Sequence, residues 1–403
     1  MLSNRIKSNY MPLFRDMKFI VLCLFMFFLG YEYWDGAYIF GGFTITKTLG
    51  ILYFIFSIVF FKKSFSINYI NKNQLFYIFI FSWILILSNL HAHLIYTSEL
   101  NFPSIIFNLQ FFIFYWIVGN EVKKSLYKKK LLFVFFILGI LSIYILMING
   151  IGLQSSNQGD SLDSLEGVTR LWFMGMNPNT LGSLTALASI LLVYLSLNSD
   201  FSYFKKMILL LLLIPFIHMI FLTGSLGSFL SLLIGVVTLL LLDKRIIFSK
   251  NAFLILIAFV LLYFTVNSID SNFLLDKLDG FLSTGNTSGR TEIWIHNYNA
   301  AVDSFILGLG LDTGLRPSHN VFLDVFIWTG ILGLLTYTLF ILSIFRVSIL
   351  NVLKYNSSLE LAILLVLLLV LFKSGGGFQI KYIWLFLAII SVPSENRSIN
   401  HVT

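Results

Sequence analysis

The chain alternates between long apolar stretches and short polar connections. These stretches repeat at lengths near the roughly 20 residues that a helix needs to cross a bilayer, so hydropathy predicts about twelve membrane-spanning helices. The predicted spans lie near residues 17–34, 43–61, 75–95, 103–119, 131–149, 178–197, 207–223, 225–242, 252–267, 319–346, 358–373 and 377–392. We therefore predict an all-α polytopic membrane protein, with residues 1–403 forming a single integral membrane domain.

Positive charges concentrate on alternate connections of this pattern. They lie at the N-terminus and after the second, fourth, sixth, eighth and tenth predicted spans, and these groups contain most of the 27 Lys and Arg residues. By the positive-inside rule these connections face the cytoplasm, so both termini are predicted to be cytoplasmic. A basic start followed by apolar residues 19–29 could be a signal peptide. No small-x-small cleavage site follows, so we interpret this stretch as an uncleaved first helix.

Composition agrees with a membrane protein and narrows the chemistry. Hydrophobic residues make up 58% of the chain and charged residues 11%, whereas soluble proteins carry about 25% charged residues. The net charge of +8 is explained by the cytoplasmic connections, so nucleic acid is not an expected partner. Cys23 is the single cysteine, which excludes a disulfide framework. There is no HExxH motif, Cys/His array or Asp-x-Asp pair, and we predict a reaction without metal or cofactor.

Two long polar connections, residues 150–177 and 267–318, fall on the predicted non-cytoplasmic face. Irregular stretches of this size cannot lie against lipid, because their backbone polar groups would be unsatisfied there. In the second, apolar residues between 292 and 305 recur at helical spacing. They predict a short amphipathic helix on the membrane surface, with Trp294 and Tyr298 at headgroup level. The alternative is an ordinary loop helix packed against the spans.

Three arginines stand out on the predicted non-cytoplasmic face, where basic residues are scarce: Arg170, Arg290 and Arg316. The planar guanidinium group presents a fork of donors that suits phosphate oxygens, so together they could bind a lipid-linked diphosphate. The alternative is that each arginine pairs with a nearby acid, such as Glu166, Glu292 or Asp312. Likewise, the acidic stretch 160–166 either contacts substrate or balances Arg170.

His319 follows Pro317 and Ser318 at the start of a predicted span. A neutral imidazole could take a proton from a sugar hydroxyl that attacks an anomeric carbon. The alternative is a histidine that caps the helix or packs in the core. The other histidines in the chain body, His91, His93, His218 and His296, have no comparable setting.

The same residues match a family signature. His319-Asn320, nine residues and then Gly330-Ile-Leu-Gly333 have the form HN-x9-GxxG, which resembles the signature of O-antigen ligases and Wzy-type O-antigen polymerases. Three further stretches are similar to this superfamily and occur in the same order: Asn177-Pro-Asn179-x-x-Gly182 after Arg170, Leu222-Thr-Gly-Ser-Leu-Gly-Ser228, and Ser288-Gly-Arg290 through Leu307-Gly-Leu-Gly310. Leu226 is a departure, because many members have an arginine there.

The resemblance implies a GT-C-like glycosyltransferase of the bacterial inner membrane that uses an undecaprenyl-diphosphate-linked saccharide as donor. It assigns a catalytic role to His319 and substrate-binding roles to Arg170, Arg290, Arg316, Asn320, Asn177 and Asn179. It also implies a chain-length regulator as a partner, and Arg290 or Arg316 could supply the charge that Leu226 does not.

Three functions remain open at this point. A polymerase would transfer the growing glycan to the non-reducing end of another lipid-linked repeat unit. A ligase would transfer it to a lipid A-core acceptor. A flippase of the same lipids is the third, although transporters usually carry internal repeats and ionisable residues near the bilayer centre. The shorter loops and Leu226 favour the polymerase.

Overall fold

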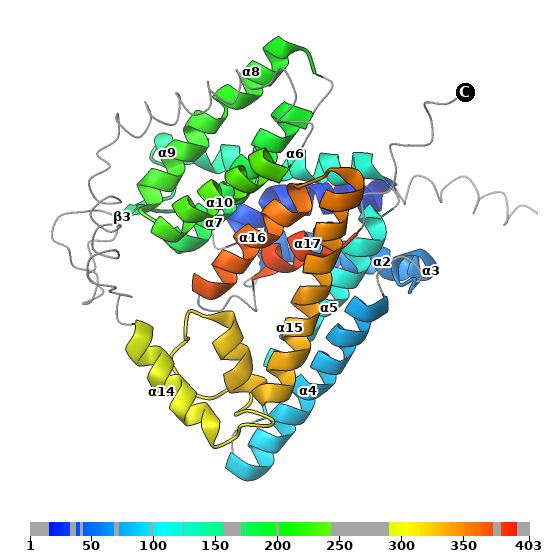
Figure 1. Ribbon diagram of the computed structural model, residues 1–403, viewed down its shortest axis with the longest axis vertical. Coiled ribbons are helices and arrows are strands. Elements are labelled where there is room, and N and C mark those ends of the chain that lie inside the picture. Colours follow the sequence, from blue (N-terminus) through cyan, green and yellow to red (C-terminus); the bar gives the residue numbers. More distant parts are fainter. Residues whose placement is uncertain are drawn as a thin grey trace, which may run out of the picture.

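The structure is a computed structural model, and it describes residues 16–32, 38–40, 43–67, 72–96, 100–123, 125–155, 171–173, 175–198, 201–242, 290–373 and 380–392. These residues form helices and two small antiparallel hairpins (Figure 1). The first half contains a helix at 16–28, η1 (Leu29–Tyr31), α2 (Ile45–Val59), α3 (Phe61–Ser64), α4 (Lys72–Tyr96), α5 (Phe102–Val122) and α6 (Leu126–Ile148). The second half contains α7 (Pro178–Asn198), α8 (Tyr203–Leu211), α9 (Leu213–Thr223), α10 (Leu226–Leu242), α14 (Arg290–Val302), α15 (Val321–Tyr355), α16 (Leu359–Lys373) and α17 (Lys381–Ile390).

Neither hairpin was predicted from the sequence. β1 (Tyr38–Phe40) pairs with β2 (Phe43–Thr44), and β3 (Leu153–Ser155) pairs with β4 (Leu171–Phe173). The second pair joins two segments of the predicted loop 150–177, with Leu153 opposite Phe173.

The helices agree with an integral membrane protein. Among the described residues, six helical segments are long and apolar enough to cross a membrane. The ninth predicted span, residues 252–267, lies outside the described residues, and every other predicted span overlaps a described helix. The all-α class is confirmed, whereas the number of twelve spans and the GT-C-like architecture stay predictions.

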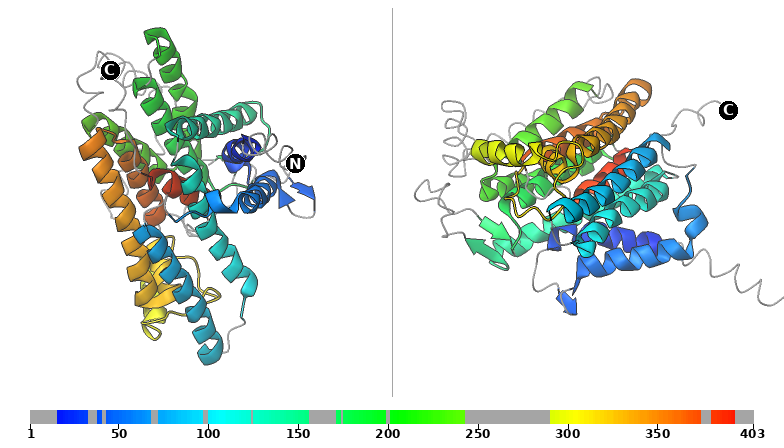
Figure 2. Two further views of the ribbon diagram at one scale, coloured as in Figure 1. Left: turned by 90° about the vertical axis from the view of Figure 1, so that its right-hand side faces the viewer. Right: turned by 90° about the horizontal axis from the view of Figure 1, so that it is seen from below.

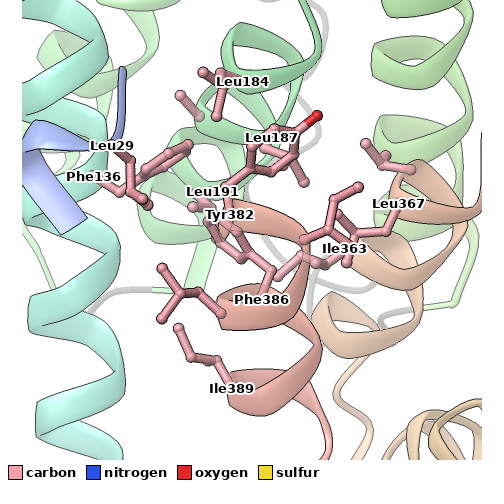
Figure 3. Packing of buried hydrophobic residues seen from close by; sticks show 14 of the residues in the cluster. Leu29, Phe136, Leu184, Leu187, Leu191, Ile363, Leu367, Tyr382, Phe386 and Ile389 are labelled. Carbon is pink, nitrogen blue, oxygen red and sulfur yellow. The ribbon is translucent and has the colours of Figure 1, made fainter. Parts of the chain in front are cut away.

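The core lies where α7, α16 and α17 meet α6 (Figure 3). Residues 382–390 of α17 are all buried, and α7 is buried along most of its length. Neither α7 nor residues 382–390 of α17 contain a charged residue, and helices without a charged face are stable where other helices cover them. In Figure 3, Phe386 of α17 and Leu191 of α7 lie at the centre of this packing.

Charged residues from three predicted cytoplasmic connections meet at one end of the bundle. Lys18 and Lys128 both pair with Glu121 at the end of α5, the former at 3.2 Å. Lys129 of α6 pairs with Glu360 at the start of α16. Connections that the charge pattern assigned to one face are therefore close together in the structure.

The helix α15 contradicts one prediction, because it is not one continuous span. Gly330 has φ 63° and ψ −165°, which reverses the chain inside the helix. As a result the rings of Phe322 and Tyr337 lie 5.7 Å apart, whereas a straight helix would separate residues 15 positions apart by about 22 Å. We call residues 321–329 the first arm and residues 331–355 the second arm. The predicted span 319–346 was wrong at its start, because hydropathy does not register a chain reversal.

Candidate functional site

Two glycine motifs form one packing unit at the reversal of α15. Gly308 and Gly330 both have positive φ, and a Cβ on Gly308 would lie 2.5 Å from the Gly330 nitrogen. A Cβ on Gly330 would overlap the carbonyl of Ile306. Only glycine permits this approach of two backbones, and the region near φ +60° with extended ψ is essentially restricted to glycine. The glycines of both motifs are therefore explained by packing rather than by chemistry.

Backbone hydrogen bonds across this unit satisfy the groups that the reversal exposes. The amides of Leu309 and Gly310 donate to the carbonyls of Ile327 and Trp328 at 2.7 and 3.1 Å. The amide of Ile331 donates to the carbonyl of Phe305 at 2.8 Å. A buried helix end without such partners would be costly, so these bonds fix the loop 303–320 against α15.

The end of α4 supports the same loop. The Asn89 side chain accepts a hydrogen bond from the Leu311 amide at 3.0 Å, and the buried Ser88 hydroxyl donates to the carbonyls of Leu307 and Trp328. Figure 2 shows the loop gathered at the end of α4 and α15. The sequence analysis missed these two residues, because nothing local links α4 to a segment more than 200 positions later.

The helix α14 holds the segment that carries His319. The side chain of Asn297 donates to the Arg316 carbonyl at 2.8 Å, and the Trp294 indole donates to the Ser318 carbonyl at 2.6 Å. The indole nitrogen of Trp294 therefore faces the loop, and its predicted place at headgroup level stays a prediction.

One face of α14 packs against its neighbours, and another face is exposed. Ala301 packs against Phe326 and Ile327 of the first arm, as expected for a loop helix packed on its neighbours. Ile295 and Tyr298 are exposed, and for that face the membrane-surface prediction stays a prediction. The helix itself is confirmed.

Asp324 and Asn320 fix the chain on both sides of His319. The backbone amide and hydroxyl of Ser318 both donate to Oδ1 of Asp324, at 3.0 and 2.6 Å. Asn320 accepts from the amides of Phe322 and Leu323, so it is the N-cap of α15. Ser318 and Asp324 are buried, and neither was predicted from the sequence as a site residue.

His319 sits between these anchors in a left-handed backbone conformation, with φ 57°. Such a conformation is uncommon for residues other than glycine and persists where the surroundings impose it. The imidazole is half-buried. Burial, and then the positive charge of Arg290, lower the pKa of His319 below its usual value of 6.5. At neutral pH the ring is therefore a neutral proton acceptor.

Two other stretches of the signature, residues 177–182 and 222–228, pack against each other. Asn177 caps α7, because its side chain accepts from the Asn179 amide at 2.8 Å. The hydroxyl of Ser228, in the first turn of α10, donates to the Asn179 carbonyl at 3.4 Å. A Cβ on Gly182 would overlap the Ser228 side chain, so this glycine permits α7 and the turn to pack closely.

The predicted site residues thus divide into four groups. His319 and Arg290 are brought together, since the charge of Arg290 acts on the imidazole. Asn320, Asn177 and Asn179 have structural hydrogen bonds, and their predicted substrate contacts stay predictions. Arg316 is exposed and joins the site through its carbonyl. Arg170 lies outside the described residues.

The comparison with known families supports the interpretation of these motifs. The family model described as O-antigen ligase matches residues 208–338, which include the α9–α10 turn, Arg290 and His319. The match confirms the resemblance to the O-antigen ligase and polymerase superfamily. It supports a glycosyltransferase-like membrane enzyme that acts on lipid-linked glycans. No curated protein matches the chain.

Proposed function

We propose that this protein is a surface-polysaccharide polymerase of the bacterial inner membrane. It transfers a growing glycan from undecaprenyl diphosphate to the non-reducing end of another lipid-linked repeat unit. The observation that carries the proposal is a neutral His319, on a loop anchored from three helices, within reach of the positive charge of Arg290 at the start of α14.

The proposed chemistry uses the two side chains for different atoms. The acceptor sugar hydroxyl attacks the anomeric carbon of the donor, and the bond between that carbon and the diphosphate oxygen breaks. His319 accepts the hydroxyl proton, for which its lowered pKa suits it at neutral pH. Negative charge develops on the departing undecaprenyl diphosphate, and Arg290 stabilises it as a fixed cation. Arg170 and Arg316 assist in binding the same diphosphate.

The proposed topology places this chemistry outside the cytoplasm. The positive-inside pattern puts both termini and the Glu121 ion pairs on the cytoplasmic side. The loop 303–320, the α9–α10 turn and the start of α7 then face the periplasm. A chain-length regulator is the proposed protein partner.

Gene deletion separates the polymerase from the ligase. Lipopolysaccharide from the deletion strain should show lipid A-core that bears a single repeat unit, because ligation survives while polymerisation is lost. Core without any repeat, together with long lipid-linked polymer, would identify a ligase instead. Loss of all repeat-bearing material without such polymer would favour the flippase.

Replacing His319 with Ala tests the catalytic role directly. Long chains should disappear although the protein remains in the membrane at its normal amount. As a matched control, His296→Ala changes an exposed histidine of α14 and should leave chain length unchanged. Long chains at normal amounts in the His319→Ala strain would refute the role of this residue.

A further inference from the structure

The cation Lys373 ends α16 beside the turn that connects α9 to α10. Built on Gly227, a Cβ would lie 3.0 Å from Cδ of Lys373 and 3.8 Å from Nζ. The lysine side chain therefore lies directly over the first turn of α10, at a position where any residue with a Cβ would crowd it. This turn contains Leu226 and has no charged side chain of its own.

The same end of α16 packs against the arm that follows His319. The rings of Phe372 and Phe322 lie 4.9 Å apart, and Phe322 is three residues after His319. In Figure 1, the C-terminal end of α16 points towards α14 and the first arm of α15. Three segments distant in sequence thus meet around Lys373.

Electrostatic contacts connect the charged groups of these segments. Arg290 is close enough to Lys373 for the two positive charges to interact, and it also acts on His319. Within the described part of the chain, Lys373 has no acidic partner. Cations that converge in partly buried surroundings repel one another, and an anion bound between them removes this cost.

We propose that Lys373 binds the diphosphate of the lipid-linked donor together with Arg290, supplying a positive charge at the first turn of α10. The inference rests on the proposed function for the identity of the donor. A diphosphate fits because it presents several anionic oxygens to cations that arrive from separate helices. Lysine contacts phosphate as a compact charge, and the first turn of a helix such as α10 favours anions as well.

Binding of a soluble probe to the full-length protein in lipid nanodiscs tests this role. The probe is farnesyl diphosphate, measured by isothermal titration calorimetry. Lys373→Gln should weaken binding about 10- to 100-fold, the effect of losing one charge-assisted contact. Lys373→Arg keeps the charge and should stay within about threefold of the wild type. Lys354→Gln, the same change at an exposed lysine at the far end of α15, should have no effect.

Two further probes distinguish the diphosphate from an acidic sugar of the repeat unit. Inorganic pyrophosphate should compete with farnesyl diphosphate, and glucuronate should not. Unchanged affinity in Lys373→Gln, with normal gel filtration and melting temperature, would overturn the proposal. Competition by glucuronate as strong as that by pyrophosphate would overturn it too, because the site would then recognise the sugar.

Chain extension in cells separates failure of this inference from failure of the proposed function. If the wild type extends chains and Lys373→Gln binds and extends normally, the role of Lys373 is wrong and the polymerase stands. If Lys373→Gln loses probe affinity but deletion of the gene leaves chain extension intact, the polymerase is wrong and the diphosphate site stands.

Discussion

Asp324 holds the loop that carries His319, so removal of its carboxylate should release that loop. Oδ1 of Asp324 accepts both the amide and the hydroxyl of Ser318, at 3.0 and 2.6 Å. In Asp324→Ala the hydroxyl can still donate to the Asn320 carbonyl, 2.8 Å away. The Ser318 amide loses its acceptor, and Ser318 is fully buried.

The size of the effect follows from this single orphaned donor. Hydrogen bonds to a charged group contribute about 1.5–3 kcal/mol, and a buried donor without a partner carries a similar penalty. We therefore expect the ordered loop to lose about 2–3 kcal/mol, which reduces its population relative to the open form about 30- to 150-fold. Chain extension should fall by up to this factor, because His319 is positioned only in the ordered loop.

Asp324→Asn provides the matched comparison. It keeps an oxygen acceptor at the Oδ1 position, and Oδ2 has no hydrogen-bond partner among the described residues, so its replacement by an amide nitrogen removes no bond. The remaining loss is the difference between a charged and a neutral acceptor, about 1 kcal/mol. Asp324→Asn should therefore be much more active than Asp324→Ala.

Hydrogen exchange measured by mass spectrometry can follow the loop directly. Peptides that cover residues 311–324 should exchange faster in Asp324→Ala, while peptides from the buried helix α17 keep wild-type protection, because the opening is local. Asp303→Ala, at an exposed aspartate after α14, serves as control. Wild-type exchange and activity in Asp324→Ala would refute the anchoring role of this carboxylate.

Three further predictions concern the reversal of α15 and the electrostatics of the site. Gly330→Ala should sharply reduce the yield of folded protein in gel filtration, because a Cβ overlaps the Ile306 carbonyl in a region of φ and ψ that costs about 1–3 kcal/mol for other residues. Gly314→Ala should be mild, since Gly314 has a similar φ of +65° and open space around it, and equal losses in both variants would contradict the packing explanation. In Arg290→Gln the acid limb of the pH–rate profile should move to higher pH, because loss of the like charge raises the pKa of His319 towards 6.5 and the reaction needs the neutral ring. An unshifted pH–rate profile in Arg290→Gln would show that Arg290 does not act on this imidazole. The melting temperature of the wild type should fall as pH drops from about 6.5 through the lowered pKa of His319, because the unfolded state binds the proton more readily than the folded state.

The apolar and charged pattern of the chain was enough to predict the membrane class and the position of most helices. Ion pairs join the ends of three connections that the charge pattern assigned to one face, Lys18 with Glu121 and Lys129 with Glu360, and the orientation of that face stays a prediction. These properties depend on composition within windows of about 20 residues, where a bilayer imposes a strong requirement. The motif around His319 and Arg290 was likewise visible in the sequence.

Tertiary structure alone decided how these residues are placed. The reversal at Gly330, the inward-facing Trp294 and the approach of Lys373 to Gly227 all arise from contacts between distant segments. Hydropathy gives the same score to a straight span and to one that folds back, and it does not show which partner the side chain of a tryptophan bonds. Close packing and hydrogen bonding across the fold decide between these arrangements, and no local pattern in the chain contains that information.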